Sequence, residues 1–250
     1  MPQLIEDVQN VALDIPASID EMDYVKEYAD EFYSNYIENF VGNKKRRIVF
    51  RFLKRFGDIF LSGIALLLLW PVMLAIALAV KIDSKGPVVF KQKRVGRNGE
   101  LFNCLKFRSM RIDAPKNAPT SLLEDPEQYY TRVGRFLRKT SLDELPQLWC
   151  VFIGKMSIIG YRPLVPNEKK ANNMREQLGV FSMRPGISGL AQVRGRDDVY
   201  YKNKALLDAE YVKNATIWLD IKLVLQTALV VLGRKGNKSN SKSTEKELLR

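Results

Sequence analysis

The chain of 250 residues contains no histidine and only two cysteines. The lack of histidine excludes Ser-His-Asp and Cys-His catalysis, and it excludes a zinc site with imidazole ligands. Cys104 and Cys150 form no CxxC pair or metal-ligand pattern, so we expect them to be packing residues in a reducing compartment. Any acid, base or nucleophile must therefore be a carboxylate, lysine, tyrosine, serine or cysteine.

Charge is absent from one long stretch, the twenty-two residues of 59–80. About 20 apolar residues are enough for a straight helix to cross the hydrocarbon core of a bilayer. The stretch is too long, and begins too far from the N-terminus, for the apolar region of a cleaved signal peptide. We therefore expect a helix embedded in a membrane.

Both flanks of this stretch are basic, with seven Lys or Arg residues in 44–58 and six in 81–97. A spanning helix carries its excess of positive charge on the cytoplasmic side, and here neither flank has such an excess. Pro71 lies near the middle of the stretch, where it removes a backbone donor and kinks a helix. These features favour a re-entrant helical hairpin that returns both ends to the cytoplasmic face. A Pro-kinked single-pass helix is the alternative.

The net charge of the chain is divided unevenly along its length. Residues 1–43 contain ten acids and one base, whereas the remainder contains thirty-nine bases and eighteen acids. A basic body beside an apolar anchor suits the anionic cytoplasmic leaflet and phosphate-bearing substrates, and it would also attract nucleic acid. We divide the chain into an acidic N-terminal helical extension (1–43), a basic interfacial segment with the membrane helix (44–81), a cytoplasmic domain (82–233) and a disordered basic tail (234–250).

The hydrophobic pattern predicts an α/β fold that is mainly helical. An extended run at 88–90, turn residues at 96–99 and a second strand at 101–107 predict a small β-hairpin. Helical periodicity recurs at 129–137, 142–153, 167–177 and 204–232. The apolar end of the last segment contains Asp220 and Lys222, which favours an amphipathic helix at the membrane interface over a crossing.

The strongest candidates for chemistry are the adjacent carboxylates Asp143 and Glu144. Two carboxylates can bind a hard divalent cation, and one of them can attack a phosphorus atom. Helix capping explains the same residues, because Ser141 with Glu144 matches a capping box, and Asp143 could instead be the N-cap with Pro146 in the first turn. Phosphate oxygens bind well at a helix start, so the structural and catalytic interpretations are compatible.

Several further motifs accompany this pair in a fixed order, namely FKQKRVG at 90–96, KFRSM at 106–110, SLDELPQL at 141–148, GYRPL at 160–164 and RPGISGLAQVRGR at 184–196. The series closely resembles the monotopic polyprenyl-phosphate phosphoglycosyl transferases, the bacterial sugar transferase family, over about residues 48 to 233. The resemblance implies transfer of a phosphosugar from a UDP-sugar to undecaprenyl phosphate, with release of UMP, at the start of surface glycan assembly. It places the catalytic domain (82–233) on the cytoplasmic face of the bacterial inner membrane, in contact with membrane lipids, and leaves homodimerisation open.

The resemblance also implies roles for single residues. Asp143 would form a covalent phosphosugar-aspartyl intermediate and contact Mg²⁺, and Glu144 would complete the magnesium site or act as a base toward the lipid phosphate. Cations are needed as well, because an anionic lipid phosphate attacks a diphosphate only when charge is neutralised. The candidates for substrate binding are Arg94, Lys106, Arg138, Arg162, Pro163, Arg196 and Asp208.

Four positions depart from the common pattern of the family. A proline is frequent before its Arg-Pro pair, a serine before its membrane proline, and a tryptophan and an asparagine in its last motif. This chain has Tyr161, Trp70, Leu190 and Arg194 at those positions. The changes put the geometry of the Arg-Pro turn and of the membrane bend in question, and they bear on sugar or nucleotide preference.

Two other functions compete with the enzyme. A non-catalytic basic membrane adaptor would recruit partners through the acidic extension, and it would tolerate substitution of Asp143 and Glu144. A nucleic-acid binder ranks third, because no recognition helix or aromatic RNA-binding motif accompanies the basic charge. The ordered motifs favour the enzyme, so we expect no nucleic-acid partner.

Overall fold

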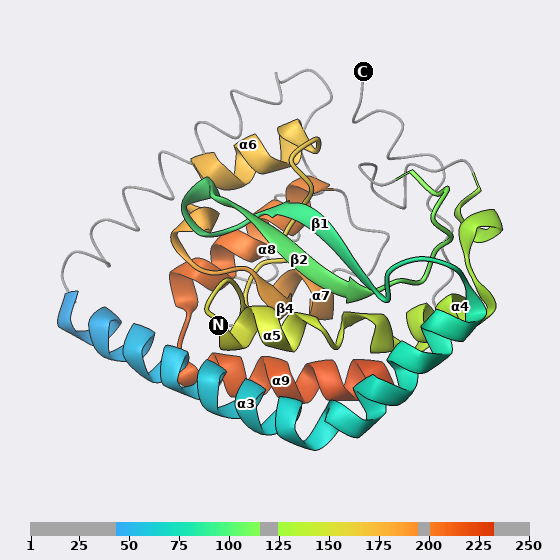
Figure 1. Cartoon of the computed structure of the whole chain (residues 1–250). Coiled ribbons are helices and arrows are strands. Elements are labelled where there is room, and N and C mark those ends of the chain that lie inside the picture. The colour runs from blue at the N-terminus through green and yellow to red at the C-terminus, as the bar shows by residue number, and fades with distance from the viewer. Residues whose placement is uncertain (1–43, 116–124, 195–200, 233–250) are drawn as a thin grey trace.

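The computed structural model describes residues 44–115, 125–194 and 201–232. The helix predicted within 1–43, the disorder predicted for 234–250 and the predicted site residue Arg196 lie outside these ranges. Within them the chain is mostly helical, with a small β-hairpin above one long helix (Figure 1). The predicted fold class is thus confirmed in its broad form.

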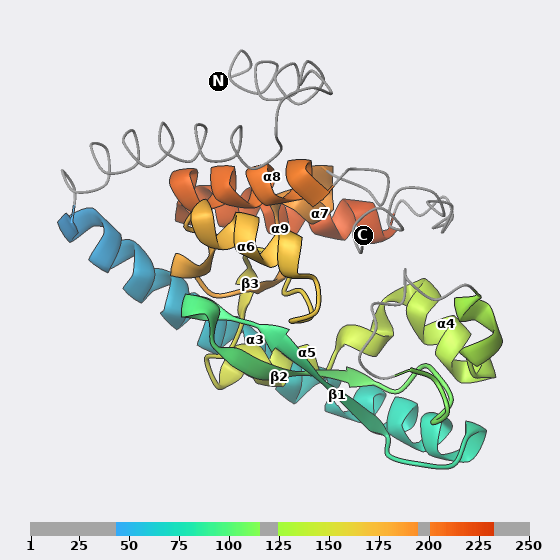
Figure 2. The same ribbon diagram turned by 90° about the horizontal axis from the view of Figure 1, so that it is seen from above.

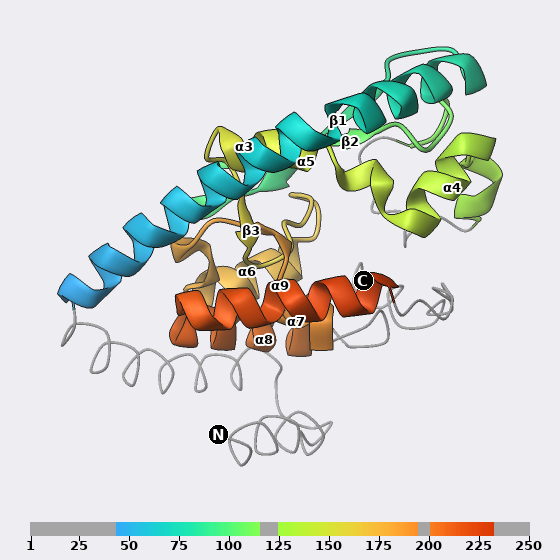
Figure 3. The same ribbon diagram turned by 90° about the horizontal axis from the view of Figure 1, so that it is seen from below.

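The longest element, α3, is a helix over Lys44–Asp83 with Pro71 inside it. Figure 1 shows that α3 bends near its middle, whereas its axis looks nearly straight from below (Figure 3), so the bend lies in the plane of the first view. Proline accounts for the bend, because it lacks the N–H donor and its ring crowds the preceding turn. Residues Ile48–Asp83 are long and apolar enough to cross a membrane, by length and composition. The re-entrant path stays a prediction.

The predicted hairpin is present, and its first strand is longer than the sequence pattern indicated. Strand β1, Val89–Val95, pairs antiparallel with β2, Leu101–Phe107. The turn between them contains the 3₁₀ turn η1, Arg97–Gly99, in which Asn98 and Gly99 have φ of 55° and 75°. Asn and Gly tolerate this left-handed region best. From above, the hairpin runs beside α3 and α5 (Figure 2).

The other elements confirm most of the predicted helices and shift some of their bounds. The segment 204–232, predicted to be largely helical, contains parts of two helices, α8 and α9. The short apolar segment after α5 is a strand, β3. This part of the chain comprises η3 Pro126–Tyr129, α4 Arg132–Thr140, η4 Leu142–Glu144, α5 Gln147–Phe152, β3 Ser157–Ile159, α6 Lys169–Gln177, η5 Val180–Ser182, β4 Gly186–Ser188, α7 Leu190–Arg194, α8 Tyr201–Asn214 and α9 Ile217–Leu232.

Strands β3 and β4 form a parallel pair in which two glycines bring the backbones into close contact. A Cβ atom on Gly186 would lie 2.1 Å from the backbone nitrogen of Gly160, and one on Gly160 would lie 2.4 Å from the oxygen of Arg184. Neither position has room for a side chain. The contact fixes the start of the loop that contains Arg162 and Pro163.

Buried side chains form several clusters that join the hairpin to the helices. Cys104 and Cys150 are both buried, unbonded to each other, and packed with Phe102 and Met156, which confirms their predicted packing role. Another cluster joins Val80 of α3 to neighbouring elements through contacts that include Phe107 and Leu137. The C-terminal half of α3 therefore packs as part of the fold.

Polar side chains fasten the first half of α3 to the same body. The guanidinium of Arg55 donates to the carbonyl oxygens of Val151 and Phe152 at 2.7 and 2.8 Å. The buried carboxylate of Asp58 accepts from Ser157 Oγ and from Ile158 N, both at 3.0 Å. Buried polar groups of this kind are stable only when they are paired, so these contacts define how α3 sits on the domain.

The far end of α3 is fastened in the same way. The backbone N–H of Val133 donates to Asp83 Oδ2 at 3.0 Å, and Arg108 donates to the carbonyl oxygen of Ser84 at 2.7 Å. Between the two fastened ends, α3 exposes large apolar side chains, among them Leu67 and Leu68 at 71% and 69%. Large exposed apolar side chains gathered along one helix mark a surface that a membrane or a partner protein covers.

Candidate active site

The sequence pattern predicts that an α-helix begins at the carboxylate pair, but in the structure none begins there. Ser141 ends α4 in a left-handed conformation with φ 55°, its side chain makes no capping hydrogen bond, and η4 follows. Helix α5 begins only at Gln147, with Pro146 before it and no side-chain cap. Both capping interpretations are therefore wrong. The carboxylates of Asp143 and Glu144 are not used to start a helix, and their burial needs another explanation.

That explanation is a set of cations from segments far apart in the sequence. Lys106 Nζ, on β2, donates to Glu144 Oε1 at 2.6 Å and lies 4.0 Å from Asp143 Oδ2. A guanidinium nitrogen of Arg162, in the loop after β3, lies 3.5 Å from the same Glu144 oxygen. Three of the predicted motifs thus meet at one point, as expected for a site that handles phosphate.

The two carboxylates have opposite electrostatic environments. Burial raises the pKa of Asp143, and the charge of Lys106 only partly offsets this effect. Burial acts in the same direction on Glu144, but the charges of Lys106 and Arg162 outweigh it and lower its pKa to about 2. Adjacent carboxyl groups whose pKa values are pushed apart are typical of sites in which the two have different tasks.

The pair has the composition of a magnesium site that is completed by substrate. Among the residues that the structure describes, no third His, Cys, Asp or Glu joins Asp143 and Glu144 to form a metal-binding cluster. Mg²⁺ is commonly held by one or two carboxylates together with substrate phosphates and water. Two adjacent carboxylates therefore fit Mg²⁺ when a diphosphate supplies further oxygens.

Arg94 and Pro163 connect the hairpin to the loop of Arg162. The guanidinium of Arg94 donates to the carbonyl oxygen of Pro163 at 2.9 Å and to Gln92 Oε1 at 2.6 and 3.0 Å. Burial and the neighbouring charge of Arg162 lower the pKa of Arg94. In this conformation Arg94 braces the loop, so any contact with substrate would be additional to that role.

Asp208 lies inside the protein, paired with Arg175. Their side chains are 1% and 4% exposed, and an Nη atom of Arg175 lies 2.5 Å from Asp208 Oδ2. The other Nη atom donates to the backbone oxygen of Arg162 at 2.8 Å. The structure thus places Asp208 behind the site, where it acts on Arg162 through Arg175. No motif in the sequence identified Arg175, because Asp208 was predicted to bind substrate and its burial is seen only in the structure.

Arg138 lies near the pair without an ion pair to either carboxylate in the described structure. Its guanidinium stands over the ring of Tyr130, 4.7 Å from the centroid. Its charge offsets part of the rise that burial causes in the pKa of Asp143. Of the predicted site residues, Lys106 and Arg162 thus contact the carboxylates and Arg138 lies close by. Arg94, Pro163 and Asp208 support the surrounding loop.

Three of the four positions that depart from the family pattern contact other parts of the domain, whereas the side chain of Trp70 is exposed. Tyr161 is buried and packs on Phe181 with ring centroids 5.5 Å apart, and no described peptide bond is cis. Leu190 is buried in a cluster with Tyr211, and a guanidinium nitrogen of Arg194 lies 3.6 Å from Glu210 Oε1. Packing by Tyr161 therefore replaces the rigidity that a proline would give the turn.

The exposed apolar surface of α3 suits a membrane or a partner protein, and the cluster of carboxylates and cations suits a phosphate-bearing substrate. The chain belongs to the bacterial sugar transferase family, whose model matches residues 49–234. It is 42% identical over 201 residues to an undecaprenyl-phosphate galactose phosphotransferase of Salmonella typhimurium, covering 74% of this chain and 42% of that protein. It is also 42% identical over 185 residues to a UDP-glucose:undecaprenyl-phosphate glucose-1-phosphate transferase of Escherichia coli, covering 71% and 39%.

A protein of Haemophilus influenzae described as an uncharacterized sugar transferase is 39% identical over 211 residues, 78% of this chain and 44% of its own length. The chain therefore spans less than half the length of these curated relatives. The region that the family model matches contains most of α3, the hairpin and the carboxylate pair. The resemblance seen in the motifs is thus confirmed at the level of the family.

Proposed function

We propose that this protein transfers a phosphosugar from a UDP-sugar to undecaprenyl phosphate and thereby starts the assembly of a surface glycan. The names of the relatives from Salmonella typhimurium and Escherichia coli support the class of both substrates. The observation that carries the proposal is the meeting of Lys106 and Arg162 at the Asp143-Glu144 pair. Such a cluster can hold a diphosphate while its charge is neutralised.

Asp143 is the proposed nucleophile. One of its carboxylate oxygens attacks the phosphorus that bears the sugar, and the bond between that phosphorus and the bridging oxygen breaks. The bond's electron pair leaves with UMP, and the phosphosugar stays on Asp143 as an acyl phosphate. A phosphate oxygen of undecaprenyl phosphate then attacks the same phosphorus and frees Asp143, so two anionic substrates use one site in turn.

The neighbouring residues bind and orient the reacting groups. Lys106 lies near both carboxylates, so its charge keeps Asp143 available as an anion although burial favours the neutral form. Arg162 is half-exposed beside Glu144, where its planar guanidinium can also bind phosphate oxygens. Asp143 and Glu144 would hold Mg²⁺, which when bound supplies positive charge to the diphosphate.

We further propose that α3 is re-entrant, with the catalytic domain on the cytoplasmic face of the inner membrane. The attachment of α3 at both ends supports this path. Asp58 and Asp83 are twenty-five positions apart along α3, and both accept hydrogen bonds from the same domain. Twenty-five residues of straight helix are about 37 Å long, which is more than the thickness of the hydrocarbon core of a bilayer. A spanning helix would put one of the two ends on the opposite side from the domain. Helices α3 and α9 both lie on the lower side of the molecule (Figure 3), and both expose large apolar side chains, such as Leu67 and Leu229.

The reaction is tested with the purified full chain, undecaprenyl phosphate and a panel of UDP-sugars, scored by release of UMP. We expect release that requires Mg²⁺ and stops on addition of a chelator. Asp143→Asn should abolish release and leave the thermal unfolding midpoint within a few degrees of the unsubstituted protein. Full activity in that variant would disprove the nucleophile assignment, and absence of turnover with every UDP-sugar would favour the membrane adaptor.

The path of α3 is tested separately by cysteine labelling in intact cells. Cys104 and Cys150 are buried, so background labelling is low and single cysteines can be read out. We expect Arg51→Cys and Lys85→Cys both to be protected from an impermeant thiol reagent until the inner membrane is opened. Labelling of one position alone from the periplasm would show a spanning helix, and the enzyme assignment could survive that result.

A further inference from the structure

Strand β3, which precedes the loop of Arg162, is held differently on its two edges. On one edge it pairs in parallel with β4. On the other edge the described part of the chain has no strand, and the N–H of Ile158 and the hydroxyl of Ser157 both donate to Asp58 Oδ1 at 3.0 Å. Backbone N–H groups inside a protein need an acceptor. A carboxylate of α3 therefore takes the place that a second neighbouring strand would have.

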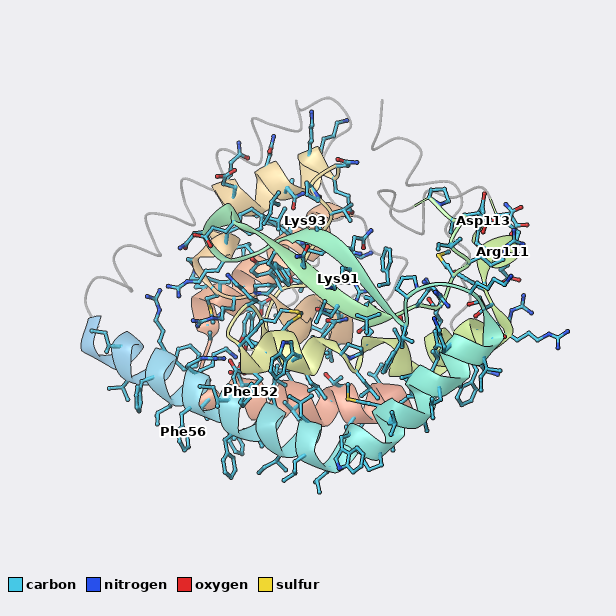
Figure 4. The ribbon with its side chains drawn as sticks, viewed as in Figure 1. Phe56, Lys91, Lys93, Arg111, Asp113 and Phe152 are labelled. Atoms are coloured by element: carbon cyan, nitrogen blue, oxygen red, sulfur yellow. The ribbon has the colours of Figure 1, made fainter. Side chains whose placement is uncertain are left out.

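The part of α3 that contains Asp58 has two faces with different contacts. Lys54, one turn earlier on the same face as Asp58, donates to Asp220 Oδ2 of α9 at 2.6 Å. Phe56 and Phe60 lie on the opposite face, where they stack with ring centroids 6.1 Å apart and are exposed. Figure 4 shows Phe56 on the lower side of the molecule. The same turns of α3 thus bind β3 and α9 on one face and present aromatic rings on the other.

The backbone from β3 to Arg162 has little freedom to absorb a shift of the strand. Only three residues separate Ile158 from Arg162. The N–H of Gly160 donates to a β4 carbonyl oxygen, and the carbonyl oxygen of Tyr161 accepts from a β4 N–H, both at 2.8 Å. The side chain of Tyr161 is fully buried. A displacement of β3 therefore moves Arg162 relative to Glu144, whose Oε1 lies 3.5 Å from its guanidinium.

We propose that Asp58 is a positioning residue for the candidate active site. By accepting from the open edge of β3, it sets the place at which the guanidinium of Arg162 meets the diphosphate. The inference rests on the proposed function, in which Arg162 binds that diphosphate. Misplacing a substrate-binding group by about 1 Å can cost about 100-fold in rate. The seating of α3 in the membrane is thereby coupled to binding of the UDP-sugar, because the same turns of α3 make both contacts.

The role of Asp58 is tested by a double-mutant cycle with Arg162, measured as UMP release by the full chain in detergent. We expect Asp58→Ala to raise KM for the UDP-sugar about tenfold and to change kcat less. In the Arg162→Gln background, the same substitution should change kcat/KM by less than about twofold, because the group that Asp58 positions is gone. An equal factor in both backgrounds would overturn the proposal, since Asp58 would then act only on the fold as a whole.

Two milder variants keep the test decisive if Asp58→Ala fails to fold. Asp58→Asn keeps an oxygen that can accept both hydrogen bonds, so it should recover most of the loss in kcat/KM. Ser157→Ala removes one donor and leaves the bond from Ile158, so it should show the same dependence on Arg162 with a smaller factor. Asp58→Asn as impaired as Asp58→Ala, or a Ser157→Ala loss that is the same in both backgrounds, would overturn the proposal.

Asp83→Ala is the matched control. Asp83 lies on the same helix and also accepts from a backbone N–H at 3.0 Å, but that N–H belongs to Val133 of α4. Any change in kcat/KM should therefore be the same with Arg162 and in the Arg162→Gln background. A loss that depends on Arg162 in this control would show that any loosening of α3 is sufficient, and it would overturn the particular role of Asp58.

Hydrogen exchange provides a readout that needs no turnover. In Asp58→Ala the amides of 157–162 should exchange at least about tenfold faster than in the unsubstituted protein, and in Asp83→Ala within about twofold of it. Unchanged exchange in Asp58→Ala would overturn the positioning role even in an active enzyme. Absence of UMP release by the unsubstituted protein would instead overturn the proposed function, so the two failures are distinguished.

Discussion

Two charged clusters on either side of Arg162 differ in their access to solvent. On one side, Lys106 and Glu144 have side chains that are 22% and 20% exposed, and Arg162 itself is 49% exposed. On the other side, Arg175 and Asp208 are 4% and 1% exposed, and Arg175 binds the backbone oxygen of Arg162. The first cluster is open to a ligand and the second is closed to one.

The difference shows how one fold can hold charges for two purposes. Ion pairs inside a protein lose their hydration, and they keep their place only when geometry and hydrogen bonding are good. Arg175 and Asp208 meet these conditions and act as a fixed support. Lys106 and Arg162 are partly exposed, so their positive charge can bind a diphosphate. We infer that loss of the closed pair should affect folding first, and loss of the open cluster should affect turnover first.

The largest effect is expected for Arg175→Met, which leaves the carboxylate of Asp208 buried without its cation. Removing one partner of a buried pair costs roughly 3–5 kcal/mol. Chemical denaturation in detergent should show this loss of unfolding free energy. The control is the double variant Arg175→Met with Asp208→Leu, which should regain most of the stability but little of the UMP release. Full activity in the double variant would show that the bond to the Arg162 backbone is unimportant.

The next effect concerns the open cluster. Lys106→Met removes the cation nearest to both carboxylates, and we expect kcat for UMP release to fall roughly 10²–10³-fold, as for other losses of one transition-state donor. The unfolding free energy should fall by less than in Arg175→Met, because Lys106 and Glu144 are partly exposed and Arg162 stays beside Glu144. A loss of stability as large as that of Arg175→Met would erase the contrast between the two clusters.

A smaller effect is expected where the backbone of β4 touches that of β3. Gly186→Ala places a Cβ atom 2.1 Å from the Gly160 nitrogen, so the strands must separate and the loop with Arg162 must shift. Overpacking of this kind costs roughly 1–3 kcal/mol. The thermal midpoint should fall and KM for the UDP-sugar should rise. Gly57→Ala is the control, since nothing lies within 4 Å of its added Cβ atom and alanine suits the interior of α3 better than glycine, so it should not lower the midpoint and should leave KM unchanged.

The smallest effect separates the charge of Arg162 from its shape. Arg162→Lys keeps the charge but loses the planar fork, and we expect kcat/KM to fall about tenfold with stability unchanged. The kcat/KM of Arg162→Gln should be lower still, because this variant loses the charge as well. Equal activity in the unsubstituted protein and in Arg162→Gln would place Arg162 outside the substrate site.

Local signals in the sequence were strong where neighbours along the chain decide the structure. The alternation and turn residues of 88–107 predicted the hairpin, because Asn98 and Gly99 suit the left-handed turn that joins its strands. The uncharged stretch and Pro71 predicted a long bent helix, since length, hydropathy and a missing N–H are properties of the segment itself. The motifs also placed Lys106, Asp143, Glu144 and Arg162 in one site before any distance was known.

Capping was the clearest failure of local reasoning. Ser141 and Glu144 have the spacing of a capping box, yet Glu144 pairs with Lys106, thirty-eight residues away, and Ser141 ends α4 instead. A strong tertiary ion pair competes with a local hydrogen bond for the same side chain, and the sequence pattern contains only the local one.

The sequence by itself determined the chemical inventory of this protein. It excluded histidine chemistry, supplied one apolar helix long enough to cross a membrane, and paired two carboxylates within basic motifs, because these properties belong to residues and their near neighbours. Tertiary structure alone decided that Arg175 supports Arg162, that Asp208 is closed to solvent, and that Arg55 of α3 binds the carbonyl groups at the end of α5. These arrangements depend on which distant segments pack together, and packing brings charges within a few ångströms that the linear order separates by tens of residues.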